Sequence, residues 1–118
     1  MKLVLLVCAF LLTGCLSQTN YSNYDLIELR IQNDSWSTSR ARIYCDDGTH
    51  LATVYDLRFT EVTSKRVRLP PNCQALIVEA IGHGQSRLST PRSVVPQEVV
   101  CVRVNSIMDA IWGVGCQR

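Results

Sequence analysis

Hydrophobic and polar residues alternate along most of this 118-residue chain after residue 25. Ile27, Leu29 and Ile31 are separated by single polar residues, and the same two-residue period returns over residues 40–45. A two-residue period places successive side chains on opposite faces of a strand, so one face of each segment is expected to be buried. Alternation or apolar content predicts further strands over residues 50–56, 65–69, 75–81, 88–95 and 99–104, with 59–62 either a short strand or a connection.

Turn-forming residues separate these predicted strands at short intervals. Residues 33–39 are almost entirely polar, and Asp46-Asp47-Gly48 is typical of a tight hairpin turn. Pro91 makes the segment around it an edge strand or an irregular piece, because proline has no backbone N–H to donate. No segment before Asn105 shows a helical period. Six or seven short strands divided in this way predict an all-β fold, an antiparallel sandwich.

The C-terminal tail has a different pattern, which predicts one short helical turn. Ser106 is expected to cap the turn, and Gly113 and Gly115 are expected to end it. Its shared apolar face would consist of Ile107, Met108, Ile111 and Trp112. Such a turn would plug an open end of the sandwich, and an apolar contact for a partner is the alternative.

The first fifteen residues carry a separate signal. Lys2 precedes an apolar run from Leu3 to Leu12, and Leu12-Thr13-Gly14-Cys15 closes it. A basic start, a short apolar run and small residues characterise a secretory signal. The run is well short of the roughly 20 residues that cross a bilayer as a helix.

The closing motif resembles the lipobox of bacterial lipoproteins, in which the cysteine is acylated and begins the mature protein. The resemblance implies three acyl groups on Cys15, palmitate among them, which exceeds the single chain that gives only marginal membrane binding. It also implies the outer membrane, with the domain facing the periplasm, because the next residue is Leu16 rather than Asp. The predicted parts are a signal peptide at 1–14, a polar lipidated tether at 15–24 and a single β-sandwich domain at 25–118.

Six cysteines are present, and four of them remain for the domain. Cys8 leaves with the signal and Cys15 is assigned to lipid. An even number of cysteines in an exported domain predicts two disulfides, with three possible connectivities. Among these we favour Cys45–Cys73 with Cys101–Cys116, because the second pair closes a short loop. Four buried free thiols are the alternative, while the absence of C-x₂₋₄-C spacing argues against a zinc site.

Charge and histidine content narrow the possible functions. The net charge of +2 predicts no nucleic-acid partner. His50 and His83 are the only histidines, and no nucleophile, base and orienting group are evident together. Gly84-Gln85-Ser86 begins like a nucleophile elbow but lacks the closing glycine. We therefore expect a non-catalytic protein without a metal or another cofactor.

Two arginine pairs are candidates for anion binding. Arg40 and Arg42 share one strand face, and Arg66 and Arg68 share another. If the two strands are neighbours in one sheet, the four guanidinium groups form a stripe able to bind phosphates or carboxylates. An ordinary solvated sheet face is the alternative.

Several segments resemble known envelope proteins. The broad layout resembles small envelope lipoproteins with a transthyretin- or immunoglobulin-like sandwich, which implies that fold and no shared catalytic residues. This resemblance covers most of residues 25–104 and rests on the following segments: Ala41-Arg42-Ile43-Tyr44, Leu51-Ala52-Thr53-Val54, Val67-Arg68-Leu69-Pro70, 75–81 and 94–99.

A dozen residues carry a second, local resemblance. Tyr44-Cys45-x-Asp47-Gly48-x-x-Leu51-x-x-x-Tyr55 resembles the opening hairpin of membrane-bound lysozyme inhibitors, although their Ser-Gly-x-x-Tyr loop has no counterpart here. The function expected from the sequence is a structural or interaction role at the cell envelope, with an envelope protein or a glycan as partner. The alternative is an inhibitor or ligand-binding lipoprotein that uses the 46–50 hairpin or the arginine stripe.

Overall fold

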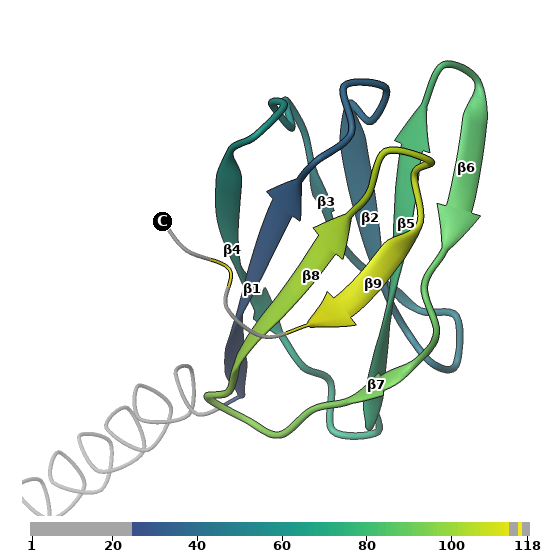
Figure 1. Cartoon of the computed structure of the whole chain (residues 1–118). Coiled ribbons are helices and arrows are strands. Elements are labelled where there is room, and N and C mark those ends of the chain that lie inside the picture. Colours follow the sequence, from purple (N-terminus) through teal and green to yellow (C-terminus); the bar gives the residue numbers. More distant parts are fainter. Residues whose placement is uncertain (1–24, 114–115, 117–118) are drawn as a thin grey trace, which may run out of the picture.

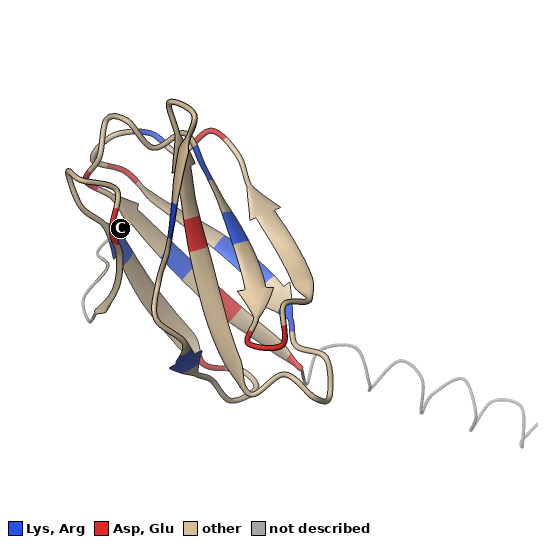
Figure 2. Cartoon of the chain, turned by 90° about the vertical axis from the view of Figure 1, so that its right-hand side faces the viewer, with Lys and Arg blue, Asp and Glu red and all other residues tan. Residues whose placement is uncertain are grey.

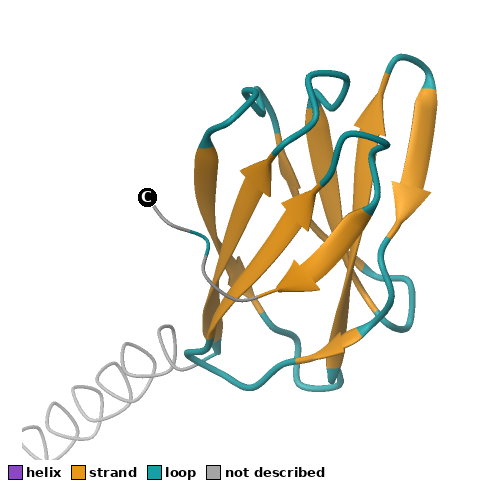
Figure 3. Ribbon diagram, in the orientation of Figure 1, coloured by secondary structure: helices purple, strands orange, loops and turns teal. Residues whose placement is uncertain are grey.

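The computed structural model describes residues 25–113 and Cys116, which form two β-sheets packed face to face (Figures 1 and 3). The predicted signal peptide, Cys15 and the tether lie outside these residues. Within the described part there is no helix, and so none long and apolar enough to span a membrane. The strands are β1 (Leu26–Asn33), β2 (Arg40–Cys45), β3 (His50–Val54), β4 (Val62–Arg68), β5 (Ala75–Gly82), β6 (Gln85–Leu88), β7 (Arg92–Ser93), β8 (Val99–Val104) and β9 (Ala110–Gly113).

The first sheet has the strand order β4-β1-β8-β9. β1 pairs antiparallel with β4 but parallel with β8, with Leu29 opposite Val100 and Ile31 opposite Val102. The expectation of a purely antiparallel sandwich is therefore wrong at this pair. The reason is that the β7–β8 connection crosses from the second sheet at the end where β1 begins, so β8 runs in the same direction as β1 (Figure 1).

The second sheet has the strand order β3-β2-β5-β6, and β7 pairs with the same β5 beyond the end of β6. β5 lies in the interior of this sheet, as expected for the most apolar segment. Between β6 and β7, the backbone N–H of Ser89 donates to the carbonyl of Val78 (2.8 Å), and the Ser89 hydroxyl accepts from the N–H of Val78 (2.9 Å). The serine side chain thus continues the pairing where Pro91 interrupts the edge.

The core lies between the two sheets and is formed by the predicted inward positions. The alternation of buried and half-buried residues is complete along β1 and β2. Each fully buried aliphatic side chain contributes about 1.5–3 kcal/mol by its removal from water. The fully buried aliphatic side chains include Ile27, Leu29, Ile31, Ile43, Leu76, Val78, Val102 and Val104.

Both predicted disulfides are present, in the favoured pairing. Cys45–Cys73 joins the end of β2 to the β4–β5 connection, and Cys101–Cys116 joins β8 to the C-terminal tail. All four cysteines are buried. The first bridge ties the second sheet to the connection that arrives from the first sheet, which links the two layers at one end of the sandwich.

The predicted C-terminal helical turn is wrong. Residues 110–113 form β9, with Trp112 opposite Val102 on β8. The Asn105 side chain accepts hydrogen bonds from the N–H groups of Ile107 (3.1 Å) and Asp109 (3.0 Å), which closes a tight turn in place of a helix. Burial alternates in this segment: Met108 and Ala110 are buried, whereas Ile107 and Ile111 are more than half exposed.

Candidate functional site

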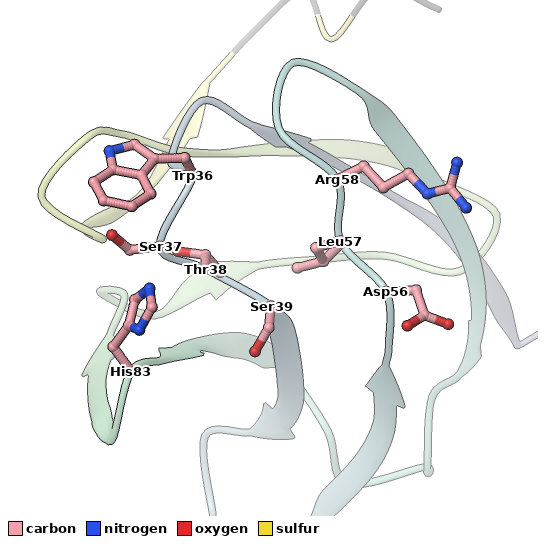
Figure 4. Close-up of a pocket in the computed structure, with 8 residues that line it drawn as sticks. All are labelled: Trp36, Ser37, Thr38, Ser39, Asp56, Leu57, Arg58 and His83. Carbon is pink, nitrogen blue, oxygen red and sulfur yellow. The ribbon is translucent and has the colours of Figure 1, made fainter.

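The loops at one end of the sandwich (Figure 1) surround an open hollow of about 520 Å³, whose lining residues are drawn in Figure 4. They are the β1–β2, β3–β4 and β5–β6 connections, which are far apart in the sequence. The hollow is lined by Trp36, Ser37, Thr38, Ser39, Asp56, Leu57, Arg58 and His83. We call this feature the loop-end hollow.

Asn33, at the end of β1, holds two of these loops together. The side chain is 1% exposed, and its amide N–H₂ donates to the carbonyls of Thr38 (3.2 Å) and Leu57 (3.4 Å). Its amide oxygen accepts from the backbone N–H of Ser35 (3.1 Å). One buried side chain therefore connects the β1–β2 loop to the β3–β4 loop, which satisfies backbone groups that would otherwise lack partners.

The third loop is held by close backbone contact. A Cβ atom added at Gly82 would lie 1.9 Å from the carbonyl oxygen of Ser37, so only glycine fits where β5 meets the β1–β2 loop. Ser39 continues the contact by donating its backbone N–H to the carbonyl of Ile81 (2.9 Å) and accepting from the N–H of Leu57 (3.0 Å). Hydrogen bonds thus join the β1–β2 and β3–β4 loops to each other and to the end of β5, from which the β5–β6 loop begins.

Two of the lining residues have left-handed backbone conformations. Asp56 has a φ of 57° and His83 a φ of 48°, and both are non-glycine residues. This region costs about 1–3 kcal/mol for such residues and persists only where the surrounding structure imposes it. At Asp56 the conformation ends β3 two residues earlier than the alternation predicted.

The lining side chains are chemically mixed, as Figure 4 shows. Trp36 is 75% exposed, and its ring meets that of His83 edge to face with centroids 6.1 Å apart. Asp56 and Arg58 lie across the hollow from these rings, with Leu57 between the two sides (Figure 4). The side chains of Asp56 and Arg58 extend away from the two rings, so the charged groups and the aromatic surface face different directions (Figure 4).

A second polar cluster lies on the outer face of the second sheet, around Tyr44. The Tyr44 hydroxyl donates to Glu79 (3.2 Å), and its ring contacts that of His50 with centroids 5.5 Å apart. The pKa of Arg42 is raised, mainly because its guanidinium interacts with the Tyr44 side chain. Glu79 makes a smaller contribution in the same direction. The Tyr44 hydroxyl and the Glu79 carboxylate thus pair with each other, whereas the His50 ring forms its hydrogen bond with the Thr53 hydroxyl (2.8 Å).

The proposed arginine stripe is not formed. Arg40 and Arg42 lie on β2 in the second sheet, whereas Arg66 and Arg68 lie on β4 in the first. The inward neighbours of both pairs are core residues, so the pairs project from opposite faces of the sandwich. Figure 2 shows basic and acidic residues interspersed along the strands, and Arg68 forms an ion pair with Asp25 (2.9 Å).

The 46–50 hairpin lies at the end of the sandwich opposite the loop-end hollow (Figure 1). Gly48 has a φ of 93°, and the carboxylate of Asp47 accepts from the N–H of Thr49 (2.9 Å). This hydrogen bond is the main cause that lowers the pKa of Asp47. Cys45, Asp46 and Cys73 are close enough to hold a metal ion, but the disulfide occupies both sulfur atoms.

Sequence reasoning missed the loop-end hollow, since it treated residues 33–39 only as a turn. The available signal was Trp36, a large aromatic residue between two serines in a polar segment. Nothing in the sequence indicated that Asp56, Arg58 and His83 lie at the same end of the molecule, because they belong to loops that are far apart in the sequence.

No protein-family model and no curated protein sequence matches this chain. Among solved structures, the chain is similar to an NMR structure of a protein from Eubacterium rectale, with a TM-score of 0.52 and 13% identity. That match covers 82% of this chain and 93% of the other, and it supports the fold alone. A disulfide-locked mutant of intermedilysin with human CD59 aligns with a TM-score of 0.39 and 13% identity, over 80% of this chain and 25% of that one.

Proposed function

We propose that this chain is a lipid-anchored protein of the cell envelope with a non-catalytic interaction role. Its sandwich is of the transthyretin or immunoglobulin type, and the loop-end hollow is its recognition site. Acylation at Cys15 attaches it to the outer membrane, with the domain in the periplasm. The motif Leu12-Thr13-Gly14-Cys15 supports the anchor. The hollow, with the hydrogen-bonded loops that surround it, supports the recognition role.

The observation that carries this proposal is the position of the hollow relative to the start of the domain. β1 begins at one end of the sandwich and ends at Asn33, beside the hollow at the other end (Figure 1). Its eight residues, at about 3.3 Å per residue, span about 26 Å. If the chain is anchored ahead of β1, the start of β1 is the end of the sandwich nearer the membrane. The hollow then lies at the opposite end, away from the membrane.

Replacement of Cys15 with serine is expected to abolish membrane attachment, because serine does not offer the thiol that is acylated. The measurements are the intact mass and the partitioning between detergent and aqueous phases. We expect the wild-type protein to carry a lipid-sized mass increase and to enter the detergent phase, and the variant to lack both. A wild-type protein that is unmodified and stays in the aqueous phase would contradict the proposed anchor.

One observation favours an inhibitor as a second candidate function. A second hollow, of about 320 Å³, lies between the 46–50 hairpin and the outer face of the second sheet, and Asp46 and Glu79 contribute acidic groups to its lining. Acidic groups beside an apolar side chain, Leu88, suit a basic protein partner.

Titration of a panel of lysozymes with the purified protein separates the two candidates. Under the main proposal we expect no inhibition, since the inhibitory loop of the resembling family has no counterpart. Inhibition that Asp46→Ala reduces and Trp36→Ala leaves unchanged would instead assign the function to the hairpin end.

A further inference from the structure

The outer face of the second sheet carries apolar side chains at positions that are usually polar. In β5 the outward positions of the alternating part are Ile77, Glu79 and Ile81. In β1 of the first sheet, by contrast, every outward position after Leu26 is polar or charged. A sheet that packs one face on the core normally has polar residues on the other face. The outward isoleucines of β5 therefore indicate that another protein surface covers this face.

Two strongly exposed apolar side chains lie at the two margins of the same face. Leu88, on the edge strand β6, is 65% exposed and lies opposite Glu79 of β5. Tyr55, directly after β3 at the other margin, is also 65% exposed. Between the margins, Tyr44 of β2 lies opposite Ile77 and lines a hollow on each side. Large exposed apolar residues that share one face mark an interaction surface.

The two hollows beside Tyr44 have complementary linings. The hollow over β2 and β3, of about 390 Å³, is lined by Arg42, Tyr44, His50, Thr53 and Tyr55. The hollow over β2, β5 and β6 is the one of about 320 Å³ that contains Asp46 and Glu79. None of the ion pairs between described residues includes Arg42, Asp46 or Glu79. One half of the face thus offers a guanidinium donor, and the other half offers carboxylate acceptors.

The strand register places these groups at one level of the sheet. From β3 to β6, one row across the outer face consists of Thr53, Arg42, Glu79 and Leu88. A two-fold axis that runs along the strands between β2 and β5 exchanges the two halves of this row. Arg42 of one copy then faces Glu79 of a second copy, and Leu88 faces Thr53. In the row nearer the hairpin, Tyr44 faces Ile77 by the same operation.

From this complementarity we infer that the outer face of the second sheet binds a second copy of the chain. In such a two-fold dimer the same surface serves both copies, so the contact between Arg42 and Glu79 occurs twice. The contact between Tyr44 and Ile77 forms an apolar centre, and charged groups lie around it, as is usual in protein interfaces. Face-to-face packing of twisted sheets with aligned strands is a common arrangement.

The orientation of the two copies agrees with the proposed lipid anchor. An axis along the strands places the start of β1 at the same end of the dimer in both copies, so one membrane can hold both anchors. Confinement to a membrane raises the effective concentration of the copies, which favours association through a face of four strands. The dimer goes beyond the proposed recognition role, since none of the residues in these rows lines the loop-end hollow.

Charge reversal tests the dimer on the lipidated full chain, by sedimentation equilibrium in a density-matched detergent. We expect the wild type to form dimers. Arg42→Glu and Glu79→Arg are each expected to weaken self-association about tenfold or more, because each variant places like charges opposite each other twice. The matched control is Arg66→Glu, which reverses an exposed charge on the outer face of the first sheet and should leave self-association unchanged.

A mixture of the two variants gives the sharpest comparison. In a mixed dimer the Arg42→Glu copy contributes two carboxylates and the Glu79→Arg copy two guanidinium groups, so both contacts are attractive again. We expect mixed dimers with an affinity within about threefold of the wild type. The measurement is retention of one untagged variant on the other, affinity-tagged variant, after urea unfolding has shown that both are folded.

Three results would overturn this inference. The first is a wild-type protein that stays monomeric both in detergent and on liposomes, which would reject a second copy as the occupant of this face. The second is a wild-type dimer whose affinity neither charge reversal changes, because the contact would then lie elsewhere on the chain. The third is a failure of the two folded variants to form mixed dimers, which would reject the predicted contact between Arg42 and Glu79.

Discussion

Replacement of both Cys45 and Cys73 with alanine is expected to lower the free energy of unfolding by about 3.5 kcal/mol. The two cysteines are 28 residues apart, and a cross-link over a loop of this length removes about that much chain entropy from the unfolded state. Both side chains are buried, so the loss of packing acts in the same direction. The measurement is urea unfolding of wild type and variant under non-reducing conditions, followed by tryptophan fluorescence.

The second disulfide provides the matched comparison. Cys101 and Cys116 are only 15 residues apart, so their joint replacement with alanine is expected to cost about 3 kcal/mol, somewhat less than the first pair. The order of the two effects is the informative result. A loss below about 1 kcal/mol for the Cys45 and Cys73 variant would show that this bridge contributes little to the constraint of the unfolded chain.

Replacement of Asn33 with alanine is expected to cost about 3 kcal/mol and to loosen the loop-end hollow. The change removes two donated hydrogen bonds and one accepted hydrogen bond, and it leaves the buried carbonyl of Thr38 without this donor. Each buried group left without a partner costs about 1–3 kcal/mol. Urea unfolding measures the loss, and hydrogen exchange at the backbone N–H of Ser35 and Leu57 reports the local opening.

Gln32→Ala is the control for this prediction. Gln32 is the preceding residue on β1, but its side chain points away from the core and makes one long contact, to Asp34 at 3.4 Å. We expect a change within about 0.5 kcal/mol, as for most surface substitutions. If Asn33→Ala had an effect as small as this control, the buried amide would not be what holds the two loops together.

The C-terminal tail shows why a short segment is hard to interpret from its sequence. Its apolar residues at 107, 108, 111 and 112 fit one helical face, while 108, 110 and 112 fit one strand face. Both periods fit such a short stretch, so the pattern alone does not decide between them. Pairing with β8 and the turn at Asn105 decide it, and both depend on the rest of the sandwich.

The arginine pairs show the same limit at the level of the sheets. Local alternation predicts that Arg40 and Arg66 point outward, and the structure confirms this prediction. Whether β2 and β4 are neighbours depends on the route of the chain between the layers. That route places them in different sheets, so the four charges do not gather.

The sequence by itself determined the all-β class, the buried face of most strands and the presence of two disulfides. These properties are local: a two-residue period assigns each side chain to a face, and an even number of cysteines predicts that all of them form disulfides. The tertiary structure alone decided the strand order, the parallel β1–β8 pair and the loop-end hollow. Trp36, Asp56 and His83 lie on three separate connections, and they meet only because long-range strand pairing brings the ends of those strands together.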